Sequence, residues 1–270
     1  MRKLLWLVSV VVFVFGVSPA NAGHPDGKTI IQKSDEAISA WRSGTRRLVI
    51  TTKVGTQVTS EWVARNSYKE FPDGKRALLV ILEPESLKGA AHLFWKRTDN
   101  TTEEWAYYPA VRRVKRLSGL TAYDSFFGTD FTYADLGIRD LHGTHGFLSE
   151  EIHASIKAYK VETIPKEQCY YSRIISWIAV DTFLPIQRDY YDPTGRHWKT
   201  KLFEDVVTID NIPKPIQVRM LDHIRNHRTV ITVSDFCYDV ESLTKETFSP
   251  EKLSEAVSSS VCTVNVLKKR

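Results

Sequence analysis

The chain has 270 residues, with 37 Lys or Arg against 32 Asp or Glu and a formal net charge of +5. This excess of positive charge is small, whereas a nucleic-acid-binding protein requires a concentrated basic face, so we expect no nucleic-acid partner. No Pro/Gly/Ser-rich linker and no repeat of fixed period divides the sequence. Residues 23–270 are therefore expected to form one domain.

The first residues have the pattern of a secretory signal peptide. Arg2 and Lys3 precede an uncharged run from Leu4 to Val17, and the small residues of Ala20-Asn21-Ala22 follow. The run is shorter than the ~20 residues that span a bilayer. A lipoprotein would carry a cysteine just after the cleavage point, and Gly23 stands there instead. We therefore expect residues 1–22 to be cleaved near Ala22 and the remainder to be a soluble periplasmic protein.

A short helix is expected first. Ser34-Asp35-Glu36 offers an N-cap with acidic residues in the first turn, Ile38 and Trp41 share a face, and Gly44 is a stop signal. β-Branched and aromatic runs then predict strands near 46–54, 57–70, 75–83, 90–98, 102–109 and 111–118. Pro72-Asp73-Gly74 predicts a hairpin turn between two of these strands, because Pro fixes φ and Gly accepts a positive φ.

Residues 119–150 interrupt this rhythm and are interpreted as a long insertion, with a helical turn at Thr132 to Leu136. Strands are expected again near 155–164, 167–180, 186–192, 196–208, 214–224 and 228–238. Asp192-Pro193-Thr194-Gly195 is a second hairpin turn. Ser249-Pro250-Glu251 is expected to start a second short helix that runs through Ala256, with Pro in its first turn.

About a dozen consecutive strands with short connections indicate a mainly β protein in which each strand pairs with the one before it. Such a chain forms a single, strongly curved antiparallel sheet, closed or partly closed into a barrel. The concave face of that sheet must be filled by helices and side chains or by a ligand.

Aromatic side chains are the candidates for lining such a cavity. They are Trp62, Trp95, Trp105, Tyr107, Phe126, Phe127 and Phe131. An apolar cavity suits acyl chains, because burial of each CH₂ group stabilises the complex by about 0.8 kcal/mol. For any single Trp, a place in the ordinary core is the alternative interpretation. The three phenylalanines are also expected to anchor the insertion onto the sheet.

A basic block follows the aromatic strand that ends at Pro109. It consists of Arg112, Arg113, Lys115 and Arg116. Strand periodicity places positive charges on both faces, which excludes a strand with one buried face. Two interpretations remain open: a basic rim at the cavity mouth that contacts a phosphate headgroup or an acidic partner, and a solvated edge strand protected from aggregation.

No catalytic residue, metal site or cofactor is predicted, and we do not expect an enzyme. The sequence has no nucleophile elbow and no Gly-rich phosphate loop. Asp124, Asp130 and Asp135 suit turns and helix caps. His142 and His145, with Asp140 nearby and His153 further on, do not make a convincing zinc set.

Three cysteines, Cys169, Cys237 and Cys262, allow at most one intramolecular disulfide. The sequence does not choose the pair. Three free thiols packed as small hydrophobic side chains are the alternative.

Several motifs, in order, resemble those of the LolA-like family of outer-membrane lipoprotein-sorting proteins. They are Glu83 to Gly89, Trp105 to Arg116, Asp124 to Leu136, Tyr190 to Gly195 and Phe248 to Leu253. The resemblance implies an open antiparallel half-barrel whose apolar concave side is covered by short helices. It also implies a periplasmic carrier or chaperone for acylated lipoprotein or lipid cargo, moving toward an outer-membrane acceptor. The alternative is an adaptor that carries nothing and docks on an inner-membrane exporter.

Overall fold

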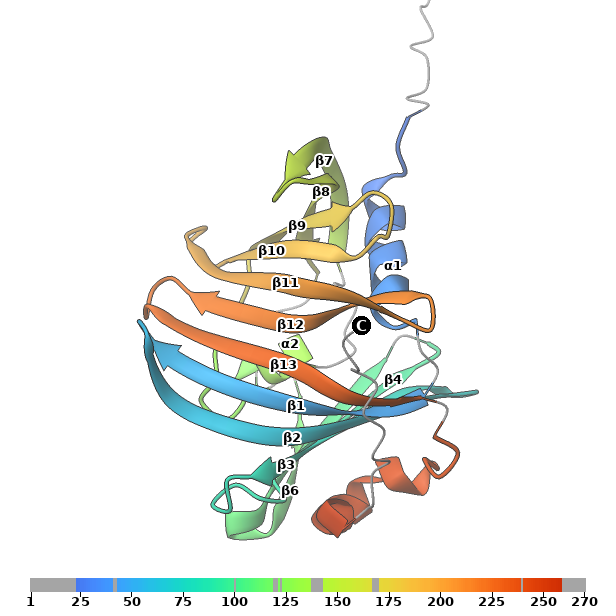
Figure 1. Ribbon diagram of the computed structural model, residues 1–270, viewed down its shortest axis with the longest axis vertical. Helices are drawn as coiled ribbons and strands as arrows, with labels where there is room; N and C mark the ends of the chain where they lie inside the picture. Colours follow the sequence, from blue (N-terminus) through green and yellow to red (C-terminus); the bar gives the residue numbers. More distant parts are fainter. Residues whose placement is uncertain are drawn as a thin grey trace, which may run out of the picture.

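One antiparallel sheet organises the chain (Figure 1). The computed structural model describes residues 23–40, 43–99, 101–118, 121, 123–136, 143–166, 170–238 and 240–258. The 13 strands of its sheet are β1 Ser43–Val54, β2 Gln57–Phe71, β3 Gly74–Glu83, β4 Ala91–Arg97, β5 Thr102–Tyr108, β6 Arg113–Leu117, β7 Gly143–His153, β8 Ile156–Pro165, β9 Arg173–Ala179, β10 Pro185–Tyr191, β11 His197–Ile209, β12 Ile212–Asp222 and β13 His227–Tyr238. The helices are α1 Gly27–Ile38, α2 Tyr133–Leu136 and the 3₁₀ helices Pro109–Val111, η3 Glu246–Phe248 and η4 Pro250–Ser258.

The strand order is β6-β5-β4-β3-β2-β1-β13-β12-β11-β10-β9-β8-β7. Strands β1 to β6 form one meander and strands β7 to β13 form another. β1 and β13 pair with each other and join the two meanders, with Leu48 opposite Val233 and Ile50 opposite Ile231. Because β6 and β7 are the two edges and do not pair with each other, the curved sheet stays open. The expected half-barrel is confirmed.

Turn chemistry explains the hairpin between β2 and β3. Phe71 pairs with Gly74, and Gly74 has a φ of 134°. A Cβ at this position would lie 2.1 Å from the carbonyl oxygen of Lys96 on the neighbouring strand. Glycine is therefore required both by the backbone conformation and by the close approach of β4. The turn predicted at Pro72-Asp73-Gly74 is confirmed.

The first helix lies earlier in the chain than the expected one. α1 begins after Asp26, whose carboxylate accepts a hydrogen bond from the Thr29 backbone N–H at 2.7 Å, and it ends at Ile38. Ser34 is thus inside the helix, and Gly44 belongs to β1, so the predicted start and stop are wrong. Trp41 lies outside the described residues. The physical reason is tertiary: Ile30 and Ile31 pack against Tyr159 and Val161 of β8, which fixes where the helix sits.

The expected insertion also contains a strand. β7 begins at Gly143 and pairs with β8 from Gly143 opposite Pro165 to His153 opposite Ile156. Alternation along β7 is weak in the sequence because an edge strand needs only one neighbour and buries little on either face. The irregular part is therefore shorter than predicted. Its described residues 123–136, which end in α2, are called the covering segment below.

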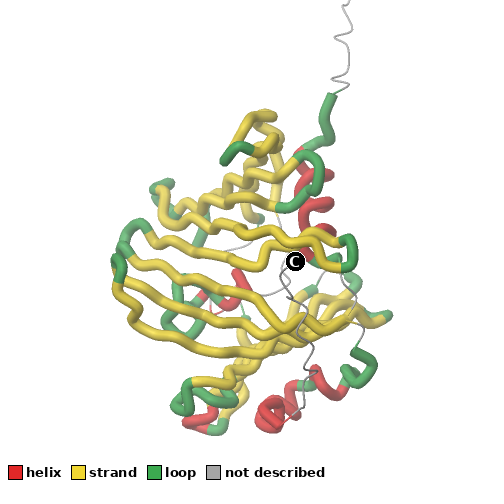
Figure 2. The backbone as a smooth tube through the Cα atoms, viewed as in Figure 1, coloured by secondary structure: helices red, strands yellow, loops and turns green. Residues whose placement is uncertain are grey.

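The two faces of the sheet carry different cores. Along β3, Leu79 and Ile81 point to the concave core, whereas Leu78 and Val80 point to a second core on the convex face. The covering segment packs inside the curve, and η3 and η4 lie outside it against β3, β4 and β5 (Figures 1 and 2). No helix within the described residues is long and apolar enough to cross a membrane.

Candidate functional site

A cavity of about 910 Å³ lies on the concave face of the sheet, between the strands, α1 and the covering segment. Its apolar wall comes from inward-facing positions of several strands. Leu48 of β1, Leu79 of β3 and Ile231, Val233 and Phe236 of β13 contribute to it. Phe131 and Leu136 add an apolar contribution from the covering segment. The cavity therefore has one continuous apolar side.

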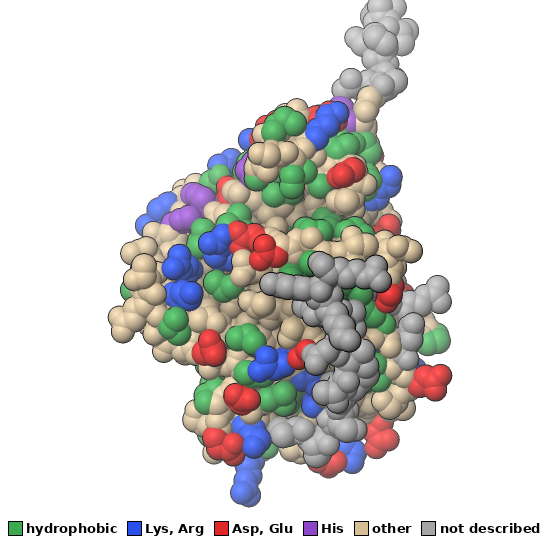
Figure 3. Space-filling model, in the orientation of Figure 1, with side chains coloured by type: hydrophobic (Ala, Val, Ile, Leu, Met, Phe, Trp, Pro, Cys, Tyr) green, Lys and Arg blue, Asp and Glu red, His purple; other side chains and the backbone are tan. Residues whose placement is uncertain are grey.

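The polar part of the lining carries more positive than negative charge. Ten Lys or Arg residues line the cavity: Lys28, Arg46, Lys69, Lys75, Arg76, Lys96, Lys166, Arg188, Lys201 and Lys214. The side chains of Lys69 and Arg76 turn to the convex face, toward Leu243 and Trp95. Four acidic residues line it: Asp35, Glu36, Glu70 and Asp135. On the outer face shown in Figure 3, Lys and Arg side chains are interspersed with Asp and Glu. The cavity lining thus carries an excess of positive charge, which favours an anionic group.

The end of α1 is held at this cavity by cationic side chains. Lys214 Nζ donates to the carbonyl oxygens of Ala37 and Ile38, both at 2.6 Å, and Lys75 Nζ donates to Ser39 Oγ at 3.2 Å. The C-terminus of a helix carries a partial negative charge, which these lysines complement. α1 therefore covers part of the cavity through polar contacts at its last turn.

Burial lowers the pKa values of two cavity lysines. The pKa of Lys214 falls to about 7, first because of burial and then because of Arg46 and Lys75. The pKa of Lys201 falls to about 8, again mainly through burial, while Asp135 opposes the shift. Both lysines face the cavity interior, where replacing water with protein penalises the charged form.

The covering segment is anchored by aromatic and polar contacts. Phe126 and Phe131 are buried, and the ring of Phe126 contacts Trp62 at a centroid distance of 6.4 Å. Asp135 Oδ2 accepts a hydrogen bond from the Thr132 N–H at 2.8 Å, as a capping residue does. Asp130 bonds instead to Thr229, far away in sequence, at 2.7 Å. The anchoring role expected for the phenylalanines is confirmed for these two.

The seven aromatic candidates fall in three places. Phe131 lies on the cavity wall. Trp62, Phe126 and Phe127 belong to the concave core beneath the covering segment, away from the cavity lining. Trp95, Trp105 and Tyr107 belong to the convex core, where Trp95 Nε1 donates to the Phe248 carbonyl at 2.8 Å. These last three are separated from the cavity by the sheet.

The convex position of Trp95 and Trp105 could not be predicted from strand periodicity. The two-residue period groups side chains by face, but it does not say which face is concave. In β4 and β5 the concave positions are taken by His92 and Glu104, a buried pair with 3.0 Å between Nε2 and Oε2. The tryptophans of the same strands therefore point outward.

The basic block lies on the edge strand β6 and the turn before it. Arg112 has a left-handed backbone with φ of 50°, and Arg113 and Lys115 are exposed. Arg116 forms an ion pair with Glu103 at 2.9 Å. None of these four residues lines the cavity. Their positions agree with the solvated-edge interpretation, and their contact with a partner stays a prediction.

Sequence reasoning missed the charged residues of the cavity, above all Arg188, Lys201 and Lys214. The sequence did contain a signal. Residues two apart in a strand share a face, and each of these cations shares its face with an aromatic or apolar residue: Arg188 with Tyr190, and Lys201 with Phe203. A charge on a mostly apolar strand face indicates an inward-pointing functional group.

The remaining predicted groups are dispersed. No set of three His, Cys, Asp or Glu side chains in the described ranges could hold a metal ion. Asp140 and His142 lie outside those ranges, whereas His145 contacts Thr163 and His153 contacts Gln187. Cys237 is disulfide-bonded. Cys169 and Cys262 lie outside the described residues.

The chain is similar to several known proteins. A family model described as an uncharacterized protein matches residues 73–255. A DUF1329 family protein from Desulfovibrio piger is 25% identical, with a TM-score of 0.77 over 85% of this chain and 100% of its own. A putative outer membrane lipoprotein-sorting protein domain from Vibrio parahaemolyticus is 23% identical, with a TM-score of 0.77 over 84% of this chain and 98% of its own.

A LolA superfamily protein from Nitrosomonas europaea is 20% identical, with a TM-score of 0.66 over 84% of this chain and 98% of its own. At these identities the Vibrio and Nitrosomonas structures show a common fold. No curated protein matches the sequence.

Proposed function

We propose that this chain, which belongs to the family of uncharacterized proteins whose model matches residues 73–255, is a carrier or chaperone for acylated molecules. The fold that it shares with the Vibrio and Nitrosomonas structures supports the proposal. The acyl chains of a lipid or a lipid-modified protein occupy the cavity on the concave face. The observation that carries the proposal is this cavity of about 910 Å³, with its continuous apolar wall.

The size and lining of the cavity support this function. Sites for small ligands typically have volumes of about 300–1,000 Å³ and are mostly apolar with a few polar groups. Acyl chains placed against Leu48, Leu79 and Val233 gain about 0.8 kcal/mol for each CH₂ removed from water. No reaction is needed for this role, so the proposal is a binding protein and not an enzyme.

The place of action is the periplasm, on the way to the outer membrane. The pattern of Arg2, Lys3 and the uncharged run to Val17 supports export across the inner membrane. The Vibrio structure, named as a putative outer membrane lipoprotein-sorting protein domain, supports cargo of that kind.

The direct test is the lipid content of the protein isolated without detergent from periplasm. Native mass spectrometry should show added mass, and extraction should release acylated molecules. Protein that is always empty, and that also fails to bind lipids and acylated peptides in solution, would defeat the proposal.

A variant that fills the cavity sharpens the test. Ala77 lines the cavity opposite Tyr68 on β2, so Ala77→Trp should occupy space that an acyl chain needs. Val58, which is 51% exposed and outside the lining, provides the matched control Val58→Trp. The first variant should lose bound lipid and the second should retain it. Equal lipid content in both would place the cargo elsewhere.

The exposed basic edge strand β6 favours a second candidate function, an adaptor on an inner-membrane exporter. An unpaired edge offers backbone N–H and C=O groups to a partner strand. Crosslinking from Arg113 to an inner-membrane protein, together with empty protein in the lipid analysis, would favour the adaptor over the carrier.

A further inference from the structure

Arg188 is buried in the cavity wall with part of its hydrogen-bonding capacity unused, although its side chain hydrogen-bonds to Tyr190. Its side chain is 8% exposed. Among the described residues, Nε and Nη2 have no hydrogen-bond partner. The Asp35 carboxylate of α1 forms a long ion pair with Arg188, in which Oδ1 lies 3.6 Å from Nη2, beyond hydrogen-bond distance. Buried charged groups are normally paired and fully hydrogen-bonded.

Lys201 lies directly opposite Arg188 on the neighbouring strand. The two residues are register partners of β10 and β11, and both line the cavity. Like charges opposite one another destabilise an antiparallel pair. Lys201 Nζ donates to the backbone oxygen of Asp135 at 3.1 Å, whereas the Asp135 carboxylate accepts from Tyr171. The two cations thus share a site in which little negative charge is bonded to them.

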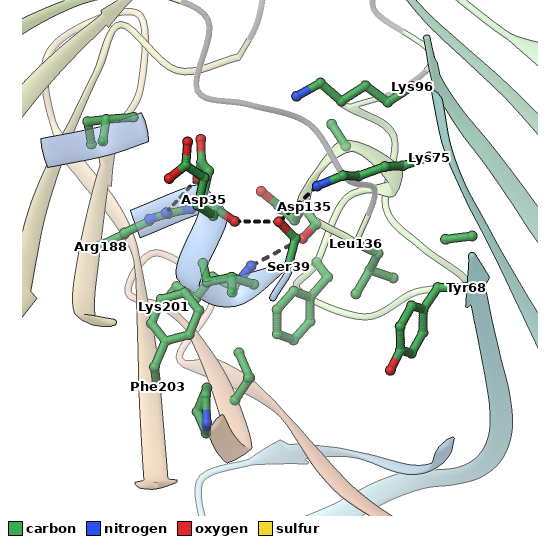
Figure 4. A pocket seen from close by; sticks show the side chains of 18 of the residues that line it. Asp35, Ser39, Tyr68, Lys75, Lys96, Asp135, Leu136, Arg188, Lys201 and Phe203 are labelled. Carbon is green, nitrogen blue, oxygen red and sulfur yellow. Dashed lines mark hydrogen bonds and ion pairs between the residues drawn. The ribbon is translucent and has the colours of Figure 1, made fainter. Parts of the chain in front are cut away.

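Figure 4 shows how this site is arranged: Arg188 points toward Asp35 at α1, and Lys201 points toward Asp135 at the covering segment. Phe203 lies under both cations, with ring centroid distances of 5.6 Å to Arg188 and 5.4 Å to Lys201. An apolar ring beneath two adjacent cations suits an amphiphile, which has an oxyanion next to its acyl chain.

We infer that Arg188 and Lys201 form a headgroup subsite that binds the phosphate or carboxylate of an anionic lipid. This inference rests on the proposed carrier function and narrows its cargo, because a neutral diacylglyceryl group would bring no additional oxyanion to either cation. Asp35 occupies the approach to Arg188 until the lipid headgroup takes its place. The arginine then donates from Nε and Nη2 to two oxygens of the headgroup, as a planar guanidinium does with phosphate or carboxylate.

Three amphiphiles with the same palmitoyl chain test the subsite: palmitate, 1-palmitoyl-lysophosphatidylglycerol and neutral 1-monopalmitoylglycerol. Affinities are measured by titration calorimetry below the micellar concentrations, at constant ionic strength. The protein should bind one or both anionic probes about tenfold or more tightly than the neutral one, as expected for charge-assisted hydrogen bonds. The anionic probe that binds better identifies the headgroup as carboxylate or phosphate.

Arg188→Gln should remove the preference for anionic probes, so that the ratio of anionic to neutral affinity falls toward one. Arg173→Gln is the matched control, because Arg173 pairs with Glu162 and does not line the cavity. Asp35→Asn should have the opposite effect, tightening anionic binding several-fold by removing a competing carboxylate. If a thermal melt shows that Arg188→Gln is poorly folded, the tighter anionic binding of Asp35→Asn still tests the subsite.

The outcomes separate the two proposals. Equal binding of all three probes, unchanged in Asp35→Asn, would overturn the headgroup subsite and leave the carrier function standing. Failure to bind any probe or any acylated peptide would overturn the carrier function itself.

Discussion

The Nδ1 atom of His227 lies 2.7 Å from Oδ2 of Asp130, which joins the first residue of β13 to the middle of the covering segment. Because a carboxylate only accepts hydrogen bonds, Nδ1 is the donor. Asp130 is fully buried, and Thr229 Oγ1 and Arg225 Nη2 also donate to it. This network fixes the position of the segment that closes the concave face.

Removing the Asp130 carboxylate should therefore loosen the covering segment. Asp130→Ala loses three hydrogen bonds from His227, Thr229 and Arg225, and the free energy of unfolding should fall by about 3 kcal/mol. Urea denaturation measures the loss, and hydrogen exchange should rise in residues 123–136. Asp99→Ala is the control, since Asp99 is exposed and its hydrogen bonds within the described residues are local ones from Thr101. Equal midpoints for the two variants would contradict the anchoring role.

Stability should increase with pH above neutrality because of Lys214. Its pKa in the folded protein, about 7, lies below the ordinary value of 10.5, which the unfolded chain keeps. Between these values the unfolded chain binds a proton that the folded chain has released, so the free energy of unfolding rises with pH. Lys201, whose pKa is also lowered, acts in the same direction.

The measurement is the urea midpoint from pH 7 to pH 9 in the natural protein and in Lys214→Met. The variant should show a smaller slope with pH, whatever its stability at pH 7. Identical slopes would mean that Lys214 keeps an ordinary pKa in the folded state.

The convex core should matter for stability and not for cargo. Phe248 is fully buried there, and Phe248→Ala should lower the free energy of unfolding by about 3–5 kcal/mol through the cavity that it leaves. Affinity for palmitoyl probes should be unchanged under conditions where the variant is folded, because the sheet separates this core from the ligand. Weakened binding in the folded variant would show that the two faces are coupled.

Charge reversal on the edge strand tests the basic block separately from the cavity. Arg113→Glu combined with Lys115→Glu should leave affinity for single-chain probes unchanged, since neither residue lines the cavity. Sedimentation with vesicles containing phosphatidylglycerol should decrease at low salt, because exposed cations attract an anionic surface. Unchanged sedimentation would leave the block with the role of a solvated edge.

Much of the fold could be predicted from the sequence because its signals are local. Pro72-Asp73-Gly74 and the turn ending at Gly195 mark hairpins by backbone preference alone, and both are present in the structure. Short connections then require neighbouring strands to pair, which leads to a curved meander. Only the packing of Ile30 and Ile31 on β8 fixed the position of α1, and only pairing with β8 made a strand of the weakly patterned β7.

The site could be predicted far less well, because it depends on which face of each strand is concave. Trp95 and Trp105 have the side chains expected of a lipid cavity, yet they point to the convex core. Arg188 and Lys201 are separated by a hairpin in the sequence and become neighbours through the register of β10 and β11. The sequence by itself determined strands, turns and alternation, which are properties of neighbouring residues. Only the tertiary structure decided which alternating set encloses the cavity, because curvature and register are set by contacts between distant strands.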